Sequence, residues 1–377
     1  MRIAIVQGTR PEIIKNYSLV KALNSAGVPF EVLHTGQHSA RQMSADIYSQ
    51  MGYAPSRRFL GTYRLGSVIN WLQSTYTQDR ISCVVVNGDT AAALVGALSA
   101  LYLDIPVVHI EAGLRSGDAF MIEERNRIAV DAFSSMLFAY TEHERAVLEM
   151  SPDIRGAIFV EGNTTVDVFH DFADAIARTS AASGRYLLAT MHRKEFTGSA
   201  HRMRTVFGEL ASLAAHVCPV IFPMHPRTRD AMTRHDIPAS LLGQVQVIDP
   251  VPALESFALL KGASALLTDS GCMQEEAYMM QVPCITIRDN TERHLTIQHG
   301  ANVLVGFDAQ RLRAAVVRVL NGIECQWPPI YGAPGAGARI LQRIVDGSGE
   351  AASPARQRLP RAEAWATEVA LLSDGIV

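Results

Sequence analysis

Short apolar runs alternate with stretches of helical periodicity along most of this chain. In the first half we expect β-strands in four such runs: residues 3–6, 30–34, 83–86 and 106–110. Between them, apolar side chains recur at helical spacing, as at Ile13, Leu19 and Leu23, and residues 91–101 form a helix rich in small side chains. Apolar strands without polar alternation are typical of sheets that are buried on both faces. Their alternation with helices predicts a parallel sheet.

A second series of apolar runs begins near residue 186. We expect strands in five of its runs: residues 186–190, 220–223, 245–248, 265–267 and 284–287. Residues 169–185, which separate the two series, are typical of a linker and end in Ser183-Gly184. Polar side chains follow the strands of both series, as they do at a cleft between two sheets. The pattern predicts an α/β fold with two Rossmann-like, doubly wound domains facing across a cleft, at residues 1–170 and 184–346, and a terminal helix or tail at 347–377.

The composition narrows the class of protein further. Apolar residues make up 48% and charged residues 19% of the 377 positions, which favours large cores over disorder. A formal net charge of -3 gives no case for nucleic acid or an anionic membrane as a partner. No uncharged apolar run approaches ~18 residues, so no transmembrane helix is expected, and the start of the chain has no signal-peptide pattern. The five cysteines show no metal-ligand spacing, which indicates reduced thiols in the cytoplasm: Cys83, Cys218, Cys272, Cys284 and Cys325.

Ser270 and Gly271 lie between an apolar run and a helical stretch that includes residues 277–280. The first N–H groups of a helix lack internal partners and carry partial positive charge. A small Ser-Gly pair lets a phosphate approach these donors closely. A plain helix N-cap is the more frequent role of such a pair, and the local sequence leaves both interpretations open.

Three carboxylates of the first half follow predicted strands or open a predicted helix. Asp89 follows an apolar strand, where it either caps the next helix or faces a ligand. Glu111 directly follows residues 106–110, where burial is expected. The alternative to a functional role for this carboxylate is a structural ion pair with Arg115. Glu123 opens a helix in a charged segment, which the helix dipole also favours. Three carboxylates in different environments can divide acid and base roles among them.

Cationic side chains also gather at the strand exits. Arg10, after the first strand, and Lys15, within the following helix, either clamp a phosphate or lie at the surface. His192 follows the first strand of the second half, and Arg193 beside it favours a role as an anion ligand over a structural one.

Two further polar groups follow the strands of the second half. The segment 288–293 suits either pyrophosphate contact or a solvated loop. Glu276 comes six residues after Ser270, about where a ribose would lie, and a surface charge on the helix is the alternative. The first strand-to-helix turn lacks the G-x-G-x-x-G pattern, so the usual dinucleotide fingerprint is absent.

In this combination and order, the motifs closely resemble those of the non-hydrolysing UDP-N-acetylglucosamine 2-epimerases. The resemblance covers residues 1–346. It rests on GTRPE (8–12), TGQH (35–38), GDT (88–90), HIEAGLRSGD (109–118), EERNR (123–127), GNTTVD (162–167), HRKE (192–195), HPR (225–227), LTDSG-x-x-QEEA (267–277) and RDNTER (288–293).

The resemblance implies a glycosyltransferase-B arrangement with a UDP-sugar in the cleft, a homodimer, and no metal or NAD. It also implies the reaction: a base removes the C2 proton as UDP leaves C1, and the resulting 2-acetamidoglucal takes back UDP and a proton on the other face. Asp89, Glu111 and Glu123 match the family's acid/base carboxylates, and His192 joins them near the diphosphate. The positions that match nucleotide contacts are Arg10, Lys15, Arg127, Ser270, Gly271, Glu276 and Arg293.

The sequence departs from the family pattern at several positions, of which Cys272, in place of a second glycine, lies closest to the phosphate turn. The others are Ile122, Phe196, His294 and the displaced aromatic around Ser256-Phe257. Gln37, Gln42 and His225 are candidates for an allosteric UDP-GlcNAc site of the kind that some bacterial members have. A glycosyltransferase of the same fold and a non-catalytic nucleotide-sugar binder are the alternative functions.

Overall fold

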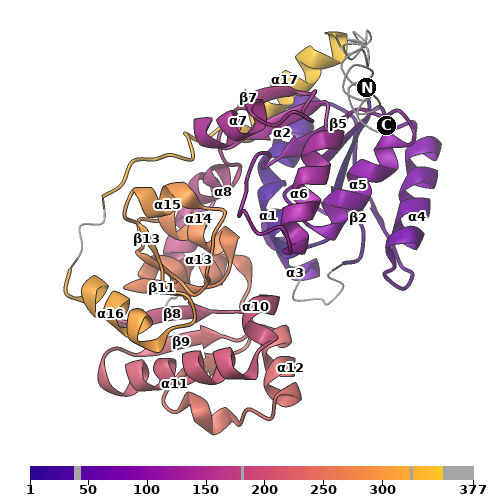
Figure 1. Ribbon diagram of the computed structural model, residues 1–377. Helices are drawn as coiled ribbons and strands as arrows, with labels where there is room; N and C mark the ends of the chain where they lie inside the picture. Colours follow the sequence, from indigo (N-terminus) through magenta and orange to yellow (C-terminus); the bar gives the residue numbers. More distant parts are fainter. Residues whose placement is uncertain (38–43, 180–181, 323–325, 351–377) are drawn as a thin grey trace, which may run out of the picture. The chain divides into compact units, whose positions relative to one another are not determined.

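Two parallel β-sheets, one in each half of the chain, carry most of the helices of this protein (Figure 1). The computed structural model describes residues 1–37, 44–179, 182–322 and 326–350. Residues 1–341 and residues 342–377 form two separate units, and both sheets belong to the first. No helix in the described ranges is long and apolar enough to cross a membrane.

The first sheet has seven strands in the order β3-β2-β1-β4-β5-β6-β7, and each neighbouring pair is parallel. The bounds are β1 (Ile3–Gln7), β2 (Phe30–His34), β3 (Arg57–Arg58), β4 (Cys83–Asn87), β5 (Val107–Ile110), β6 (Met136–Ala139) and β7 (Ala157–Val160). The helices of this half of the chain are α1 (Arg10–Lys15), α2 (Tyr17–Ala26), α3 (Ala45–Met51), α4 (Leu65–Gln78), α5 (Ala91–Leu101), α6 (Ile122–Phe133), α7 (Glu142–Glu149), α8 (Thr165–Asp171) and α9 (Ala173–Arg178).

The helix α5 packs closely on the centre of this sheet, where Val6 in β1 and Val86 in β4 are fully buried. A Cβ atom at Gly96 would lie 3.0 Å from Val6 and 2.9 Å from Val86, so only glycine fits there. A glycine inside a helix costs about 1 kcal/mol relative to alanine, and here this cost permits the close approach of helix and sheet. The same two strands end at Gln7 and Asn87 beside the polar loops of the site.

The second sheet has six parallel strands in the order β10-β9-β8-β11-β12-β13. The bounds are β8 (Leu187–Thr190), β9 (Val220–Pro223), β10 (Gln246–Ile248), β11 (Ala265–Thr268), β12 (Cys284–Thr286) and β13 (Asn302–Leu304). Its helices are α10 (Lys194–Thr197), α11 (Ala200–His216), α12 (Pro226–Arg234), the 3₁₀ helix η2 (Ala239–Leu242), α13 (Ala253–Gly262), α14 (Gly271–Met279), α15 (His294–Gln298) and α16 (Ala309–Leu320). In both sheets the order of strands reverses beside the first strand of the series, which is where ligands bind in folds of this type.

The predicted α/β class with two parallel sheets is confirmed, and each predicted strand is present to within one or two residues. The strand-to-helix turn predicted at Ser270 and Gly271 is confirmed, because α14 begins at Gly271. One prediction of local structure was wrong: the span 169–185, expected to be a linker, includes the helix α9. The last helix, α17 (Ala336–Glu350), begins before residue 347, and residues 351–377 lie outside the described ranges. The domain limits at 170, 184 and 346 stay predictions.

Candidate active site

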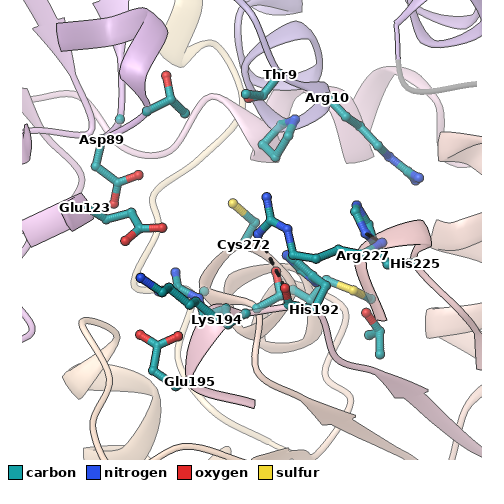
Figure 2. A pocket seen from close by; sticks show the side chains of 18 of the residues that line it. Thr9, Arg10, Asp89, Glu123, His192, Lys194, Glu195, His225, Arg227 and Cys272 are labelled. Atoms are coloured by element: carbon teal, nitrogen blue, oxygen red, sulfur yellow. Dashed lines mark hydrogen bonds between the residues drawn. The ribbon is translucent and has the colours of Figure 1, made fainter. Parts of the chain in front are cut away.

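A pocket of ≈ 1190 Å³ lies between the strand exits of the two sheets. Figure 2 shows Asp89 and Glu123 on one side of it and His192, His225 and Arg227 on another. Every site residue that the sequence predicts lines this pocket except Arg127, which is buried behind Asp89: Arg10, Lys15, Asp89, Glu111, Glu123, His192, Ser270, Gly271, Glu276 and Arg293.

Ser270 is the N-cap residue of α14, but its side chain makes no capping hydrogen bond. A Cβ atom at Gly271 would lie 2.3 Å from Glu292 Oε1, so any side chain there would displace this buried carboxylate. Cys272 follows in the first turn of the helix and also lines the pocket. Burial raises the pKa of its thiol to about 12, so Cys272 is a neutral thiol at neutral pH. The turn therefore presents a hydroxyl and the free N–H groups of a helix start to the pocket.

Glu111 lies in the loop after β5 with a φ of 72°, a left-handed conformation that costs a non-glycine residue about 1–2 kcal/mol. Lys15 Nζ lies 2.5 Å from Glu111 Oε2, and Arg293 Nη2 lies 2.7 Å from Glu111 Oε1. The expected alternative partner, Arg115, pairs instead with Asp131 at 2.7 Å, so that interpretation was wrong. The carboxylate is thus held by one cation from each half of the chain.

Asp89 lies in the loop after β4 and forms an ion pair with Arg127 Nη2. Burial would raise the pKa of Asp89, but the Arg127 charge and hydrogen bond lower it below the usual value. The capping alternative was wrong, because Thr90 is the N-cap of α5 and accepts from Ala93 N. Arg127 also binds Glu124 at 2.7 Å, so its guanidinium joins α6 to the loop of Asp89.

Glu123 lies in the first turn of α6, half-buried, next to Glu124. Glu124 points inward, where it accepts hydrogen bonds from the N–H groups of Ser116 and Gly117. Glu123 instead lines the pocket, and within the described ranges it has no ion pair at contact distance. Arg193 is the cation whose charge acts on it across the pocket.

His192 follows β8, and its ring stacks on that of His225 with centroids 5.0 Å apart. The buried carboxylate of Asp269 fixes this loop, because it accepts from the N–H of His192 at 2.9 Å and of Arg193 at 2.7 Å. Burial raises the pKa of Asp269 to about 6 even though these hydrogen bonds oppose the shift. The loop thus places an imidazole and a guanidinium at the pocket wall.

Arg10 and Glu276 form the remaining part of the wall. Arg10 Nη1 donates to Val251 O at 3.0 Å, so this cation of the first half reaches the segment before α13. Burial raises the pKa of Glu276 to about 7, and the charge of Arg10 opposes this shift. Glu276 lines the pocket about one and a half helical turns after Gly271.

Comparison with known proteins identifies the family of the chain. The model of the UDP-N-acetylglucosamine 2-epimerase family matches residues 21–345. This chain belongs to the UDP-N-acetylglucosamine 2-epimerase family. It is therefore an isomerase that acts on UDP-sugars, and its two sheets form the glycosyltransferase-B-like fold of that family.

The similarity to two relatives extends over nearly their whole length. The UDP-N-acetylglucosamine 2-epimerase of Methanocaldococcus jannaschii is 35% identical over 92% of this chain and 100% of its own. The UDP-2,3-diacetamido-2,3-dideoxy-D-glucuronate 2-epimerase of Pseudomonas aeruginosa is 34% identical over 92% of this chain and 99% of its own.

Solved structures agree with this assignment. The Methanocaldococcus jannaschii enzyme in complex with UDP-GlcNAc and UDP has a TM-score of 0.87 at 34% identity over 92% of this chain and 100% of that one. The Neisseria meningitidis enzyme bound to UDP-GlcNAc has a TM-score of 0.82 at 26% identity over 92% and 100%. A spinosyn rhamnosyltransferase, with a TM-score of 0.55 at 14% identity over the same shares, shows likeness of fold alone.

Sequence reasoning missed two buried carboxylates of this epimerase, Glu275 and Glu292. Glu292 pairs with Arg288 at 3.0 Å and lies 3.4 Å from Arg193. Both carboxylates stand beside residues that the sequence did single out, namely Glu276 and Arg293. Whether a residue lines the pocket or forms a buried ion pair beside it depends on the direction of its side chain. The residue type gives no information about that direction.

Of the three candidates for an allosteric site, Gln37 and His225 line the same pocket, and Gln42 lies outside the described residues. Gln37 Oε1 accepts from Ala92 N at 3.1 Å at the start of α5. Within the described part of the chain, no group of three or more His, Cys, Asp or Glu side chains is arranged to hold a metal ion.

Proposed function

We propose that this protein interconverts UDP-GlcNAc and UDP-ManNAc, or a close UDP-2-acetamido sugar, by elimination and re-addition of UDP. The observation that carries the proposal is the joint lining of one pocket by three carboxylates, Asp89, Glu111 and Glu123, and by the first turn of α14. The relatives from Methanocaldococcus jannaschii and Neisseria meningitidis, whose structures hold UDP-GlcNAc, support it.

In the proposed complex the diphosphate lies against Ser270 and the start of α14. The N–H groups of the first turn and the His192 ring stabilise the negative charge that develops on UDP as the C1–O bond breaks. Arg10, which reaches across from α1, adds a cation to the same region. Glu276 accepts hydrogen bonds from the ribose hydroxyls, so the nucleotide is anchored along α14.

The proton chemistry belongs to the opposite wall in this proposal. One carboxylate removes the C2 proton as UDP departs, which leaves a 2-acetamidoglucal and free UDP in the pocket. A second carboxylate on the other side of the sugar then returns a proton to C2 while UDP re-adds at C1. Inversion needs proton transfer on both faces of C2, which is why a site with several differently held carboxylates suits the reaction better than a site with one.

The sugar substituents beyond C2 define a second candidate substrate, a UDP-2-acetamido sugar with a carboxylate at C6. The Pseudomonas aeruginosa relative acts on such a glucuronate. The pocket wall also carries cations beyond those assigned to the diphosphate: Arg193, Lys194, Arg202 and Arg227.

A product assay separates the two substrates. The protein is incubated in parallel with UDP-GlcNAc and with UDP-2,3-diacetamido-2,3-dideoxy-D-glucuronate, and proton NMR follows the anomeric signals. A new signal of the C2 epimer identifies the substrate, and turnover of UDP-GlcNAc is the expected result. No epimer from either sugar, in a protein that binds UDP, would contradict the proposed function.

A further inference from the structure

Four buried charged side chains form a closed ring of ion pairs at the pocket. Lys15 Nζ lies 2.5 Å from Glu111 Oε2 and 3.5 Å from Glu275 Oε2. Arg293 closes the ring, because its Nη2 lies 2.7 Å from Glu111 Oε1 and its Nε lies 2.5 Å from Glu275 Oε1. None of the four side chains is more than 6% exposed. We call this set the four-residue ring.

Glu275 differs from the other three members of the ring. Lys15, Glu111 and Arg293 line the pocket, but Glu275 does not, so it has no surface on which to contact a substrate. Its carboxylate accepts a further hydrogen bond from Asn163 Nδ2 at 3.1 Å. Two of its three partners, Lys15 and Asn163, come from the first half of the chain, although Glu275 itself belongs to α14.

We propose that Glu275 is a positioning residue for epimerisation, which holds Lys15 and Arg293 so that they fix the Glu111 carboxylate in the pocket. The inference rests on the proposed catalytic role of Glu111. It assigns no proton transfer to Glu275, which acts only through the two cations.

Charge balance gives the physical reason. The ring contains two cations and two carboxylates, so each buried cation is shared between Glu111 and Glu275. A buried charge without a partner is costly, and its attraction to the nearest anion is strong where water is excluded. If Glu275 were neutral, Lys15 and Arg293 would have Glu111 and the diphosphate of a bound substrate as their remaining anions.

Loss of the Glu275 charge would have two effects, and both would lower turnover. The cations would bind the diphosphate at least as well as before, so substrate affinity would hold. Glu111 would be pulled from its position between them, and free UDP would be retained more tightly after elimination. Binding energy that is not specific to the transition state does not raise turnover. Removal of the Glu275 charge should therefore lower kcat and leave KM unchanged or lower.

The test is Glu275→Gln, which keeps the shape and the hydrogen bond with Asn163 but removes the charge. We expect kcat for UDP-sugar epimerisation to fall at least tenfold while KM stays the same or decreases. The variant Glu275→Asp, which keeps the charge on a shorter side chain, should recover part of the loss. A merely structural role would raise KM and lower kcat together, and that result, or a kcat within twofold of wild type, would overturn the inference.

The matched control is Glu209→Gln. Glu209 is also buried and pairs with an arginine, Arg313, at 3.0 Å, but it does not line the pocket. Its replacement should leave kcat and KM unchanged. If Glu275→Gln does not fold, Glu275→Asp carries the test, and a fall in kcat together with a rise in KM in that variant would overturn the inference. Failure of the wild-type protein to epimerise either UDP-sugar would instead count against the proposed function, so the two failures are distinguishable.

Discussion

Two carboxylates that line the pocket are held in opposite ways. Glu111 lies inside the four-residue ring with a cation at each oxygen, whereas Glu123 is half-buried and has no contact ion pair in the described part of the chain. A carboxylate between two fixed cations keeps its position, and each cation in turn depends on it for charge balance. A carboxylate without an ion pair can be replaced with little loss of stability. The comparison suggests that Glu111 is bound into the fold and that Glu123 is not.

The largest effect is expected for Glu111→Gln. We expect kcat to fall roughly 10³-fold, within the range of general acid–base catalysis. Because Lys15 and Arg293 lose one of their two carboxylates, the free energy of unfolding should also fall, on the order of 3 kcal/mol. Steady-state kinetics and urea unfolding measure the two losses. A variant as stable as wild type would show that the ring does not support the fold.

Glu123→Gln should separate activity from stability. We expect kcat to fall roughly 10²-fold, because a proton-transferring group is lost. The free energy of unfolding should change by less than about 0.5 kcal/mol, because no ion pair is broken. The same two measurements apply, and a large loss of stability here would remove the contrast between Glu111 and Glu123.

A smaller effect concerns the pH dependence of substrate binding. The pKa of Glu276 is about 7 in the free protein, so below that pH the side chain is protonated and loses an acceptor for the ribose hydroxyls. The apparent KM should therefore rise as the pH falls from 8 to about 6. Glu276→Gln should have a higher KM without this pH dependence. A wild-type KM that is constant over this range would argue against the ribose contact.

The smallest effect is expected for Cys272→Ala. The thiol is neutral at neutral pH because burial raises its pKa to about 12, so it is neither a base nor a nucleophile. We expect kcat and KM to change less than about threefold, and alkylation by iodoacetamide at pH 7 to be slow. Rapid loss of activity on alkylation of wild type, absent in the variant, would give Cys272 a role that the structure does not suggest.

The sequence allowed the sheets to be predicted where strands are apolar and β-branched, as at residues 83–86. No strand was predicted for β3, β6, β7 or β13, although β6 and β7 are four-residue apolar segments of the same length as the predicted β9. The helix α9 was not predicted, because residues 169–185 were interpreted as a linker. Strands with β-branched apolar runs thus follow from local pattern, whereas the remaining strands and the helix α9 do not.

In the candidate site, too, some features were predicted from the sequence and others were not. The residues after the strands were predicted, because parallel strands bring their exits to one edge. The partners of these residues were not: Glu111 was expected beside Arg115, yet it pairs with Lys15 and with Arg293, 182 positions away. Which of the adjacent residues Glu275 and Glu276 enters the ring depends on the rotation of α14, which its amphipathic pattern is too weak to fix.

The measurement that tests the account most directly is the fate of the C2 proton. The wild-type protein is incubated with UDP-GlcNAc in deuterated water, and deuterium at C2 is measured by NMR in the substrate and in any epimer. The account predicts deuterium at C2 in both UDP-GlcNAc and UDP-ManNAc. Epimer formation with the original proton retained, or no deuterium at C2 in a protein that binds UDP, would contradict it.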